Sequence, residues 1–197
     1  MLFLDAIYLP TRPSGAKEGV LVAWGYTKAG DRILLDVCLG LRERYEDWLE
    51  MGRGLTRRGL RAPCLPVADG APGLNKAVDE PWPESDRQRC TVHRLRNLIA
   101  KLPKRQDLHN RIRDAYWVAL DQAGSAADGE ARLRGLVGEL ASEYPGAAAT
   151  MLSTFRRSAF ISATRSGSAR IASKRHASLT RSEVKRRLPQ VALRSGG

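Results

Sequence analysis

One carboxylate, Asp5, interrupts the apolar stretch LFLDAIYL of residues 2–9. A second apolar run, LPVA of residues 65–68, ends directly on another carboxylate, Asp69. An isolated charge on a buried strand is costly unless it is paired, protonated or bound to a metal. Two such strands predict a metal site, although an aspartate near a strand end also commonly accepts backbone hydrogen bonds or starts a turn.

The apolar pattern around these two runs predicts a mixed α/β arrangement. Strands are expected at residues 2–9, 20–26 and 32–39, as an antiparallel meander whose last two strands are joined by a short hairpin-type turn. Residues 43–58 have the spacing of an amphipathic helix, and residues 62–68 return as a buried strand. A strand reached through a helix normally lies parallel to its partner, so Asp5 and Asp69 are expected close together.

From Gly70 onward the sequence predicts helices. They are expected at residues 72–78, 91–102, 108–122 and 128–144, and Pro145-Gly146 is interpreted as the stop of the last one. The helix over 91–102 has an apolar side formed by Val92, Leu95, Leu98 and Ile99. Its other side is expected to carry His93, Arg94, Arg96, Asn97 and Lys101.

Length and composition limit the classes of protein. With 197 residues and 43% hydrophobic content, the chain can bury one core, or one domain plus an appendage. No stretch approaches the roughly 20 apolar residues that span a bilayer, and the first residues lack a basic leader and a cleavage site. We therefore expect no membrane contact and a cytoplasmic location. Three widely spaced cysteines argue against a disulfide framework or a structural zinc site.

The net charge of +12 is distributed unevenly along the chain. Residues 1–150 hold 22 Lys and Arg against 20 Asp and Glu, whereas residues 151–197 hold 11 basic residues against Glu183 alone. The second segment is also rich in serine and has no apolar periodicity, so it cannot bury enough surface to offset its ordering entropy. We expect a disordered basic tail over residues 151–197.

Four segments, in this order and at these separations, carry a resemblance to a known family. They are LDAIYLPTR, VLVAWGYTKAGDRILL, VADGAPGLNKAV and RQRCTVHRLRNLIAKLP. Together they resemble the catalytic core of mutator-type bacterial insertion-sequence transposases, closely over residues 2–103 and more loosely to residue 149. The resemblance implies an RNase H-like core portion at 1–104 with a mixed sheet that starts β-β-β-α-β, and a helical insertion at 105–150.

The resemblance also implies a site. In this family two aspartates and a glutamate bind two divalent metal ions, and Asp5 and Asp69 match the positions of the two aspartates. Two such ions can activate a water or a 3′-hydroxyl and stabilise the leaving oxygen of a phosphodiester. Mg²⁺ or Mn²⁺ is the expected cofactor, since hard cations prefer carboxylate ligands.

Cys90 and His93 correspond to the C-x-x-H signature of the family. A turn of helix brings two residues at this spacing to one face. We expect them to have a structural or DNA-positioning role near the acidic site, with plain packing as the alternative. Four neighbouring arginines are candidates for phosphate contacts, although a solvated basic face is the ordinary alternative. They are Arg87, Arg89, Arg94 and Arg96.

The chain departs from the family pattern in two places. It opens on the first catalytic strand, without the N-terminal DNA-binding region of full-length members. The third acid has no clear counterpart, because aligning the segment around Glu183 with the family motif puts Ser178 or Thr180 at the catalytic position. The serine and arginine richness after residue 155 is what a shifted reading frame would produce. We therefore expect a truncated or frameshifted chain with little strand-transfer activity.

The leading interpretation is thus a transposase of an insertion sequence that acts on DNA in the bacterial cytoplasm, associated with the nucleoid, with a homodimer as a possible assembly. Two alternatives stay open. One is a non-catalytic DNA-binding remnant whose basic tail holds DNA without sequence preference. The other is an RNase H-like nuclease of unrelated role, because a fold does not fix a function.

Overall fold

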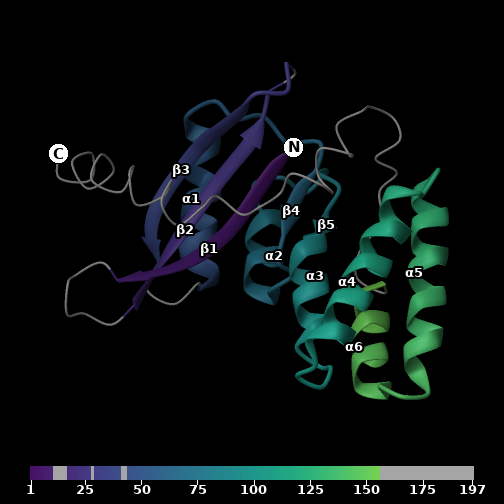
Figure 1. Cartoon of the computed structure of the whole chain (residues 1–197). Coiled ribbons are helices and arrows are strands. Elements are labelled where there is room, and N and C mark those ends of the chain that lie inside the picture. The colour runs from purple at the N-terminus through teal and green to yellow at the C-terminus, as the bar shows by residue number, and fades with distance from the viewer. Residues whose placement is uncertain (11–16, 28, 41–43, 156–197) are drawn as a thin grey trace. The chain divides into compact units, whose positions relative to one another are not determined.

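The computed structural model describes residues 1–10, 17–27, 29–40 and 44–155, which contain five strands and six helices in a mixed α/β arrangement (Figure 1). These described residues form two compact units, which divide between Arg87 and Gln88. The sequence resemblance places the end of the sheet-containing portion at residue 104 instead.

Four strands organise the first unit, the sheet unit. They are β1 (Leu2–Pro10), β2 (Lys17–Tyr26), β3 (Arg32–Gly40) and β4 (Pro66–Ala68), in the order β3-β2-β1-β4. Both β1 with β2 and β2 with β3 pair antiparallel, whereas β1 and β4 pair parallel. The predicted meander and the parallel return after a helix are confirmed. The turn between β2 and β3 contains Gly30, whose φ of 91° favours glycine.

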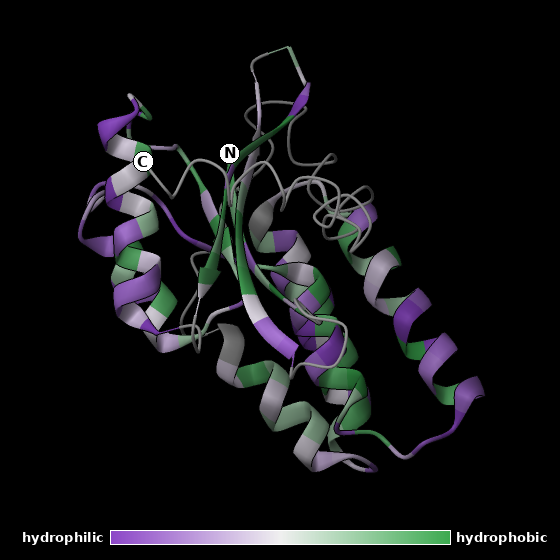
Figure 2. Cartoon of the chain, turned by 90° about the vertical axis from the view of Figure 1, so that its left-hand side faces the viewer, coloured by the Kyte–Doolittle hydropathy of each residue, from purple (hydrophilic) through white to green (hydrophobic). Residues whose placement is uncertain are grey.

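Two helices pack on one face of this sheet. They are α1 (Tyr45–Arg57), which Figure 1 shows behind the long strands, and α2 (Pro72–Asp79). Leu2 and Leu4 of β1 belong to the same buried cluster as Trp48 of α1, which is 4% exposed. The hydropathy colouring shows the alternation of apolar and polar residues on the helices and the apolar character of the strands (Figure 2). This cluster is the core of the sheet unit.

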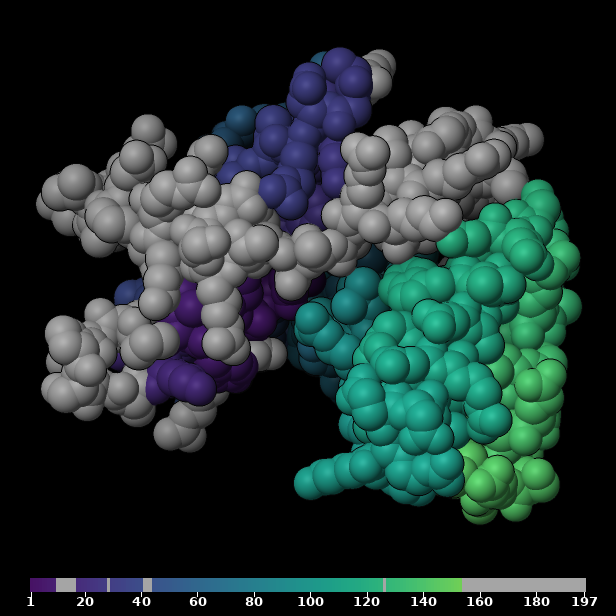
Figure 3. Space-filling view, in the orientation of Figure 1, coloured from purple at the N-terminus to yellow at the C-terminus, as the bar shows by residue number. Residues whose placement is uncertain are grey.

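The second unit, the helical unit, begins with the short strand β5 (Gln88–Arg89). Four helices follow, namely α3 (Thr91–Ile99), α4 (Gln106–Asp121), α5 (Ala126–Ala141) and α6 (Pro145–Phe155). Their side chains make up the teal and green surface in the space-filling view (Figure 3). Leu98, Tyr116 and Leu133 lie fully buried at the centre of this unit, so α3, α4 and α5 share one core.

The structure corrects two predicted boundaries. The strand expected at 62–68 is only Pro66–Ala68, and the residues before Leu65 are irregular. Pro145-Gly146 follows the end of α5 at Ala141, as the predicted stop requires, and it also starts α6, a helix that the sequence did not predict. Proline fits this first helical position because its missing N–H is not needed there. The first residues of the predicted tail, 151–155, are therefore helical. The rest of that tail, including Glu183, lies outside the described residues.

Within the part of the chain that the structure describes, no helix has both the length and the apolar character needed to cross a membrane.

Candidate functional site

The register of the parallel strands β1 and β4 indicates how far apart Asp5 and Asp69 lie along the strand direction. Leu2 of β1 is level with Pro66 of β4, and Phe3 is level with Val67. Continuing this register by two residues, just past the end of β4, brings Asp69 level with Asp5. Neighbouring strands lie about 4.8 Å apart, and residues level with each other on parallel strands project to the same face. The parallel register therefore supports the expected proximity of the two aspartates that the sequence singled out.

Strand alternation places Asp5 on the face of the sheet opposite α1. Leu2 and Leu4 pack in the core with Trp48, so the odd-numbered residues of β1 project to the other side. On that side the ring of Phe3 stacks on Trp24 of β2, with 4.2 Å between the ring centroids. Asp5 is half-buried there, beside an aromatic cluster and away from the helix-covered core.

Each of the two carboxylates accepts a backbone hydrogen bond through its Oδ1. The amide of Ala6 donates to Asp5 at 2.9 Å, and the amide of Ala71 donates to Asp69 at 2.8 Å. The second bond spans Gly70, whose φ of 93° lies in the left-handed region that disfavours residues with a Cβ. This is the Asx-turn that the sequence offered as the alternative role of such a residue. The bond orients the Asp69 carboxylate without excluding metal binding.

Two carboxylates suit one side of a Mg²⁺ or Mn²⁺ site. Magnesium is commonly held by one or two carboxylates, with waters and substrate phosphates completing its coordination. Among the described residues no group of three or more His, Cys, Asp or Glu side chains lies close enough together to hold a metal ion. Among the described residues, the candidate ligands are thus the two aspartates that the sequence singled out.

The C-x-x-H pair occupies the start of α3. Cys90 is the N-cap residue and His93 is the third helical residue, and both are half-buried. N-cap and third positions lie on the same side of the first turn, as the spacing predicted. The Cys90 carbonyl accepts the amide of Arg94 at 3.0 Å, while no side chain caps this helix end. The two residues therefore share one helical turn within the helical unit.

Arg94 differs from its predicted position on the solvent side of α3. Its side chain is 2% exposed, and burial lowers the pKa of its guanidinium. The physical reason is the helical period, because Thr91, Arg94, Leu95 and Leu98 form the buried stripe of α3. A direct phosphate contact by Arg94 is therefore not available in this conformation.

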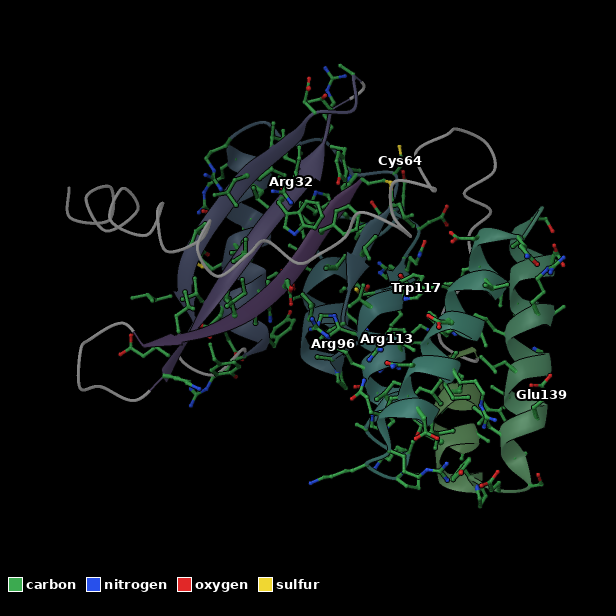
Figure 4. The ribbon with its side chains drawn as sticks, in the orientation of Figure 1. Arg32, Cys64, Arg96, Arg113, Trp117 and Glu139 are labelled. Carbon is green, nitrogen blue, oxygen red and sulfur yellow. The ribbon has the colours of Figure 1, made fainter. Side chains whose placement is uncertain are left out.

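The other three predicted arginines are accessible to different degrees. Arg96 is exposed on α3 (Figure 4), and Arg89 is half-buried on β5. Arg87 forms an ion pair with Asp79 at the end of α2. Of the set, Arg96 is the side chain best placed to meet a phosphate from solvent.

Sequence patterns do not reveal one further feature, a contact to the C-x-x-H turn from α4. The hydroxyl of Tyr116 donates a hydrogen bond to the carbonyl of Thr91 at 3.0 Å. Tyr116 is fully buried, and burial raises the pKa of its phenol. Because 25 residues separate the partners, no local motif could have revealed the contact.

Comparisons with known proteins agree with one another. Residues 1–193 match the family model described as transposase, Mutator family. The chain is 37% identical over 154 residues to the transposase for insertion sequence element IST2 of Acidithiobacillus ferrooxidans, covering 76% of this chain and 51% of that protein. It is 40% identical over 103 residues to the transposase for insertion sequence element IS6120 of Mycolicibacterium smegmatis, covering 52% of this chain and 32% of that protein. The chain thus spans about half, or less, of the length of these relatives.

Proposed function

The chain belongs to the Mutator family of transposases, and from this premise we propose that it acts on DNA, with Asp5 and Asp69 at the site of phosphodiester chemistry. The relatives that it matches are transposases for insertion sequence elements. The observation that carries the proposal is the parallel register of β1 and β4. Extended by two residues, this register makes Asp69 the counterpart of Asp5.

The same proposal includes the finer fold assignment. The element order β-β-β-α-β, the strand order β3-β2-β1-β4 and the parallel pairing of β1 with β4 support an RNase H-like core in the sheet unit. In such an arrangement the first strand lies inside the sheet and carries the first acidic residue. Asp5, in the middle of β1, has that position.

Asp5 and Asp69 are the residues that would hold a divalent ion. When bound, Mg²⁺ or Mn²⁺ supplies Lewis-acid stabilisation of a phosphodiester and lowers the pKa of an attacking hydroxyl or water. The backbone bonds from Ala6 and Ala71 orient the two carboxylates. The left-handed turn at Gly70 lets the chain leave β4 immediately after Asp69.

The C-x-x-H turn and the accessible arginines would position the nucleic acid. Arg87, Arg89 and Arg96 supply guanidinium groups that bind phosphate oxygens without reading sequence. Cys90 and His93 would act by maintaining the local structure from which these arginines extend. This division of labour is the proposed DNA-binding role of the segment between residues 87 and 96.

Nicking of a supercoiled plasmid in Mn²⁺ tests the proposal. We expect slow, metal-dependent nicking that falls to background in Asp5→Asn and in Asp69→Asn. Asp36→Asn is the matched control, because Asp36 is also a strand aspartate but pairs with Arg58 and lies level with Ala23, on the helix-covered face. Nicking that persists in the Asp5→Asn, Asp69→Asn double variant would overturn the proposed site.

A second candidate function rests on the charge distribution. Residues 151–197 carry 11 basic residues against one acid, which favours binding to DNA without sequence preference. This function predicts affinity that falls steeply with salt and is largely lost when residues 156–197 are removed, whereas Asp5→Ala changes it little. No nicking by the unsubstituted chain, together with such salt-dependent binding, would favour this function over the first.

A further inference from the structure

We propose that Tyr116 is a positioning residue that holds the first turn of α3, and with it Cys90 and His93, in a single conformation. The link to DNA positioning rests on the function proposed above. The structural part of the inference does not, because it concerns a contact within the helical unit alone.

The contact is a hydrogen bond to the backbone between the two motif residues. The Tyr116 hydroxyl, from α4, donates to the carbonyl of Thr91 at 3.0 Å. Thr91 follows Cys90 directly and precedes His93 by two residues. Both Tyr116 and Thr91 are buried, so the bond is shielded from competing water. A side chain from a neighbouring helix therefore fixes the turn at its centre.

The turn begins without a side-chain cap. Helix ends leave several backbone N–H groups without intrahelical partners, and a Ser, Thr, Asp or Asn at the N-cap normally compensates. Here the N-cap is Cys90, and no side chain makes a capping hydrogen bond. The bond from Tyr116 reaches a carbonyl and so does not replace a cap, but it ties this uncapped turn to α4.

The chemistry of the site requires a tyrosine and not merely an aromatic ring. The ring of Tyr116 packs in the core of the helical unit, edge to face with Trp117 at 5.4 Å between centroids. A buried hydroxyl without a partner would be unfavourable, so the Thr91 carbonyl accounts for its presence. Burial raises the pKa of Tyr116, which keeps the phenol protonated and able to donate.

Alkylation of the three cysteines gives a test within one molecule. Cys90 reports on the turn, and Cys64, which is exposed before β4 (Figure 4), gives the reference rate. Burial raises the pKa of Cys38 to about 11, so Cys38 reacts slowly at pH 8 unless the sheet unit unfolds. The probe is iodoacetamide, and peptide mass spectrometry gives the ratio of Cys90 to Cys64 modification.

Tyr116→Phe removes the hydroxyl and keeps the ring. Because the net contribution of one hydrogen bond is lost, the ratio of Cys90 to Cys64 alkylation should rise about three- to tenfold. Tyr144→Phe is the matched control, because its hydroxyl bonds only to the adjacent surface residue Glu143 among the contacts described, and the ratio should not change. An unchanged ratio in a folded Tyr116→Phe variant would overturn the inference. This result is independent of any DNA activity, so it separates the inference from the proposed function.

Hydrogen exchange in the unsubstituted chain gives a second test if Tyr116→Phe fails to fold. The amides of Arg94 and His109 make equivalent bonds to the N-cap carbonyls of α3 and α4, each at 3.0 Å, and neither helix has a side-chain cap. The Tyr116 contact predicts slower exchange at Arg94 than at His109. Equal or faster exchange at Arg94 would contradict the positioning role.

Discussion

The sheet unit and the helical unit position their candidate functional residues by different interactions. Asp5 and Asp69 are brought level by backbone pairing between β1 and β4, and each carboxylate accepts an amide from its own neighbourhood. Cys90 and His93 share a turn that is contacted by a buried hydroxyl from another helix. A site built on register is lost when the sheet is disturbed, whereas a site built on one side-chain contact is sensitive to a single atom.

The largest expected effect is on the free energy of unfolding, and it comes from the core that packs α1 against β1. Trp48→Ala removes the buried indole of α1 from the core that contains Leu2 and Leu4 of β1. Such a truncation typically costs about 3–5 kcal/mol of unfolding free energy. Urea unfolding followed by circular dichroism measures the loss, and Mn²⁺ binding should weaken with it. Leu39→Ala, at an exposed site on β3, is the control and should change stability little. Equal losses in the two variants would contradict the role of this core.

A smaller effect is expected at the turn after β4. Gly70→Ala places a Cβ at a φ of 93°, which costs about 1–2 kcal/mol and disturbs the Ala71 amide bond to Asp69. Gly30→Ala is matched to it, because Gly30 has a φ of 91°, no atom of another segment would approach its Cβ within 4 Å, and it lies in the β2–β3 hairpin. Both variants should lose similar stability in thermal unfolding, but only Gly70→Ala should weaken Mn²⁺ binding. Weakening in both would mean that general stability, not the turn, controls the site.

In the helical unit, general stability can be separated from the Tyr116 contact. Ser125 is the N-cap of α5, and its hydroxyl accepts the amide of Asp128 at 3.1 Å. Ser125→Ala should lower stability by about 1 kcal/mol in thermal unfolding. The Cys90 to Cys64 alkylation ratio should nevertheless stay unchanged under native conditions. If the alkylation ratio rises as much in Ser125→Ala as in Tyr116→Phe, then general stability of the helical unit, and not the Tyr116 contact, controls access to Cys90.

The smallest expected effect concerns pH and the contact between α1 and α2. Glu80 accepts hydrogen bonds from Tyr45 and Arg53, and these lower the pKa of its carboxyl. A lowered folded-state pKa means that ionised Glu80 contributes stability above its unfolded pKa of about 4.3, and that this contribution is lost as the pH falls through the folded value.

Glu80→Gln should therefore be slightly less stable than the unsubstituted chain at pH 7. The difference should shrink toward pH 3. Thermal unfolding across this range measures it, with Glu84→Gln as a control at a glutamate for which no such bonds are described. A difference that grows in acid would contradict the assigned contact.

The sequence predicted the sheet unit better than the helical unit for a physical reason. Strand alternation and the helix between β3 and β4 constrain pairing strongly, so local patterns predict Asp5 on β1 and Asp69 directly after its parallel neighbour β4. The family resemblance then supplied the expected chemistry. The backbone pairing on which the candidate site rests was thus predictable before any coordinates.

The helical unit shows where such reasoning fails. Arg94 was assigned to the solvent side because it is charged, yet its helical position relative to Leu95 and Leu98 buries it. The bond from Tyr116 to Thr91 joins residues 25 positions apart and has no local signal. Pro145-Gly146 does follow the end of α5, as the sequence predicts, but it also begins α6, which the sequence does not predict. Local patterns alone therefore miss features that tertiary packing decides.

Isothermal titration of Mn²⁺ into the purified chain tests the central claim most directly. If the register of β1 and β4 creates a carboxylate pair, the unsubstituted chain and Asp36→Asn will bind Mn²⁺, and the Asp5→Asn, Asp69→Asn double variant will not. Binding that persists unchanged in the double variant, or no binding by any of the three chains, would contradict the account.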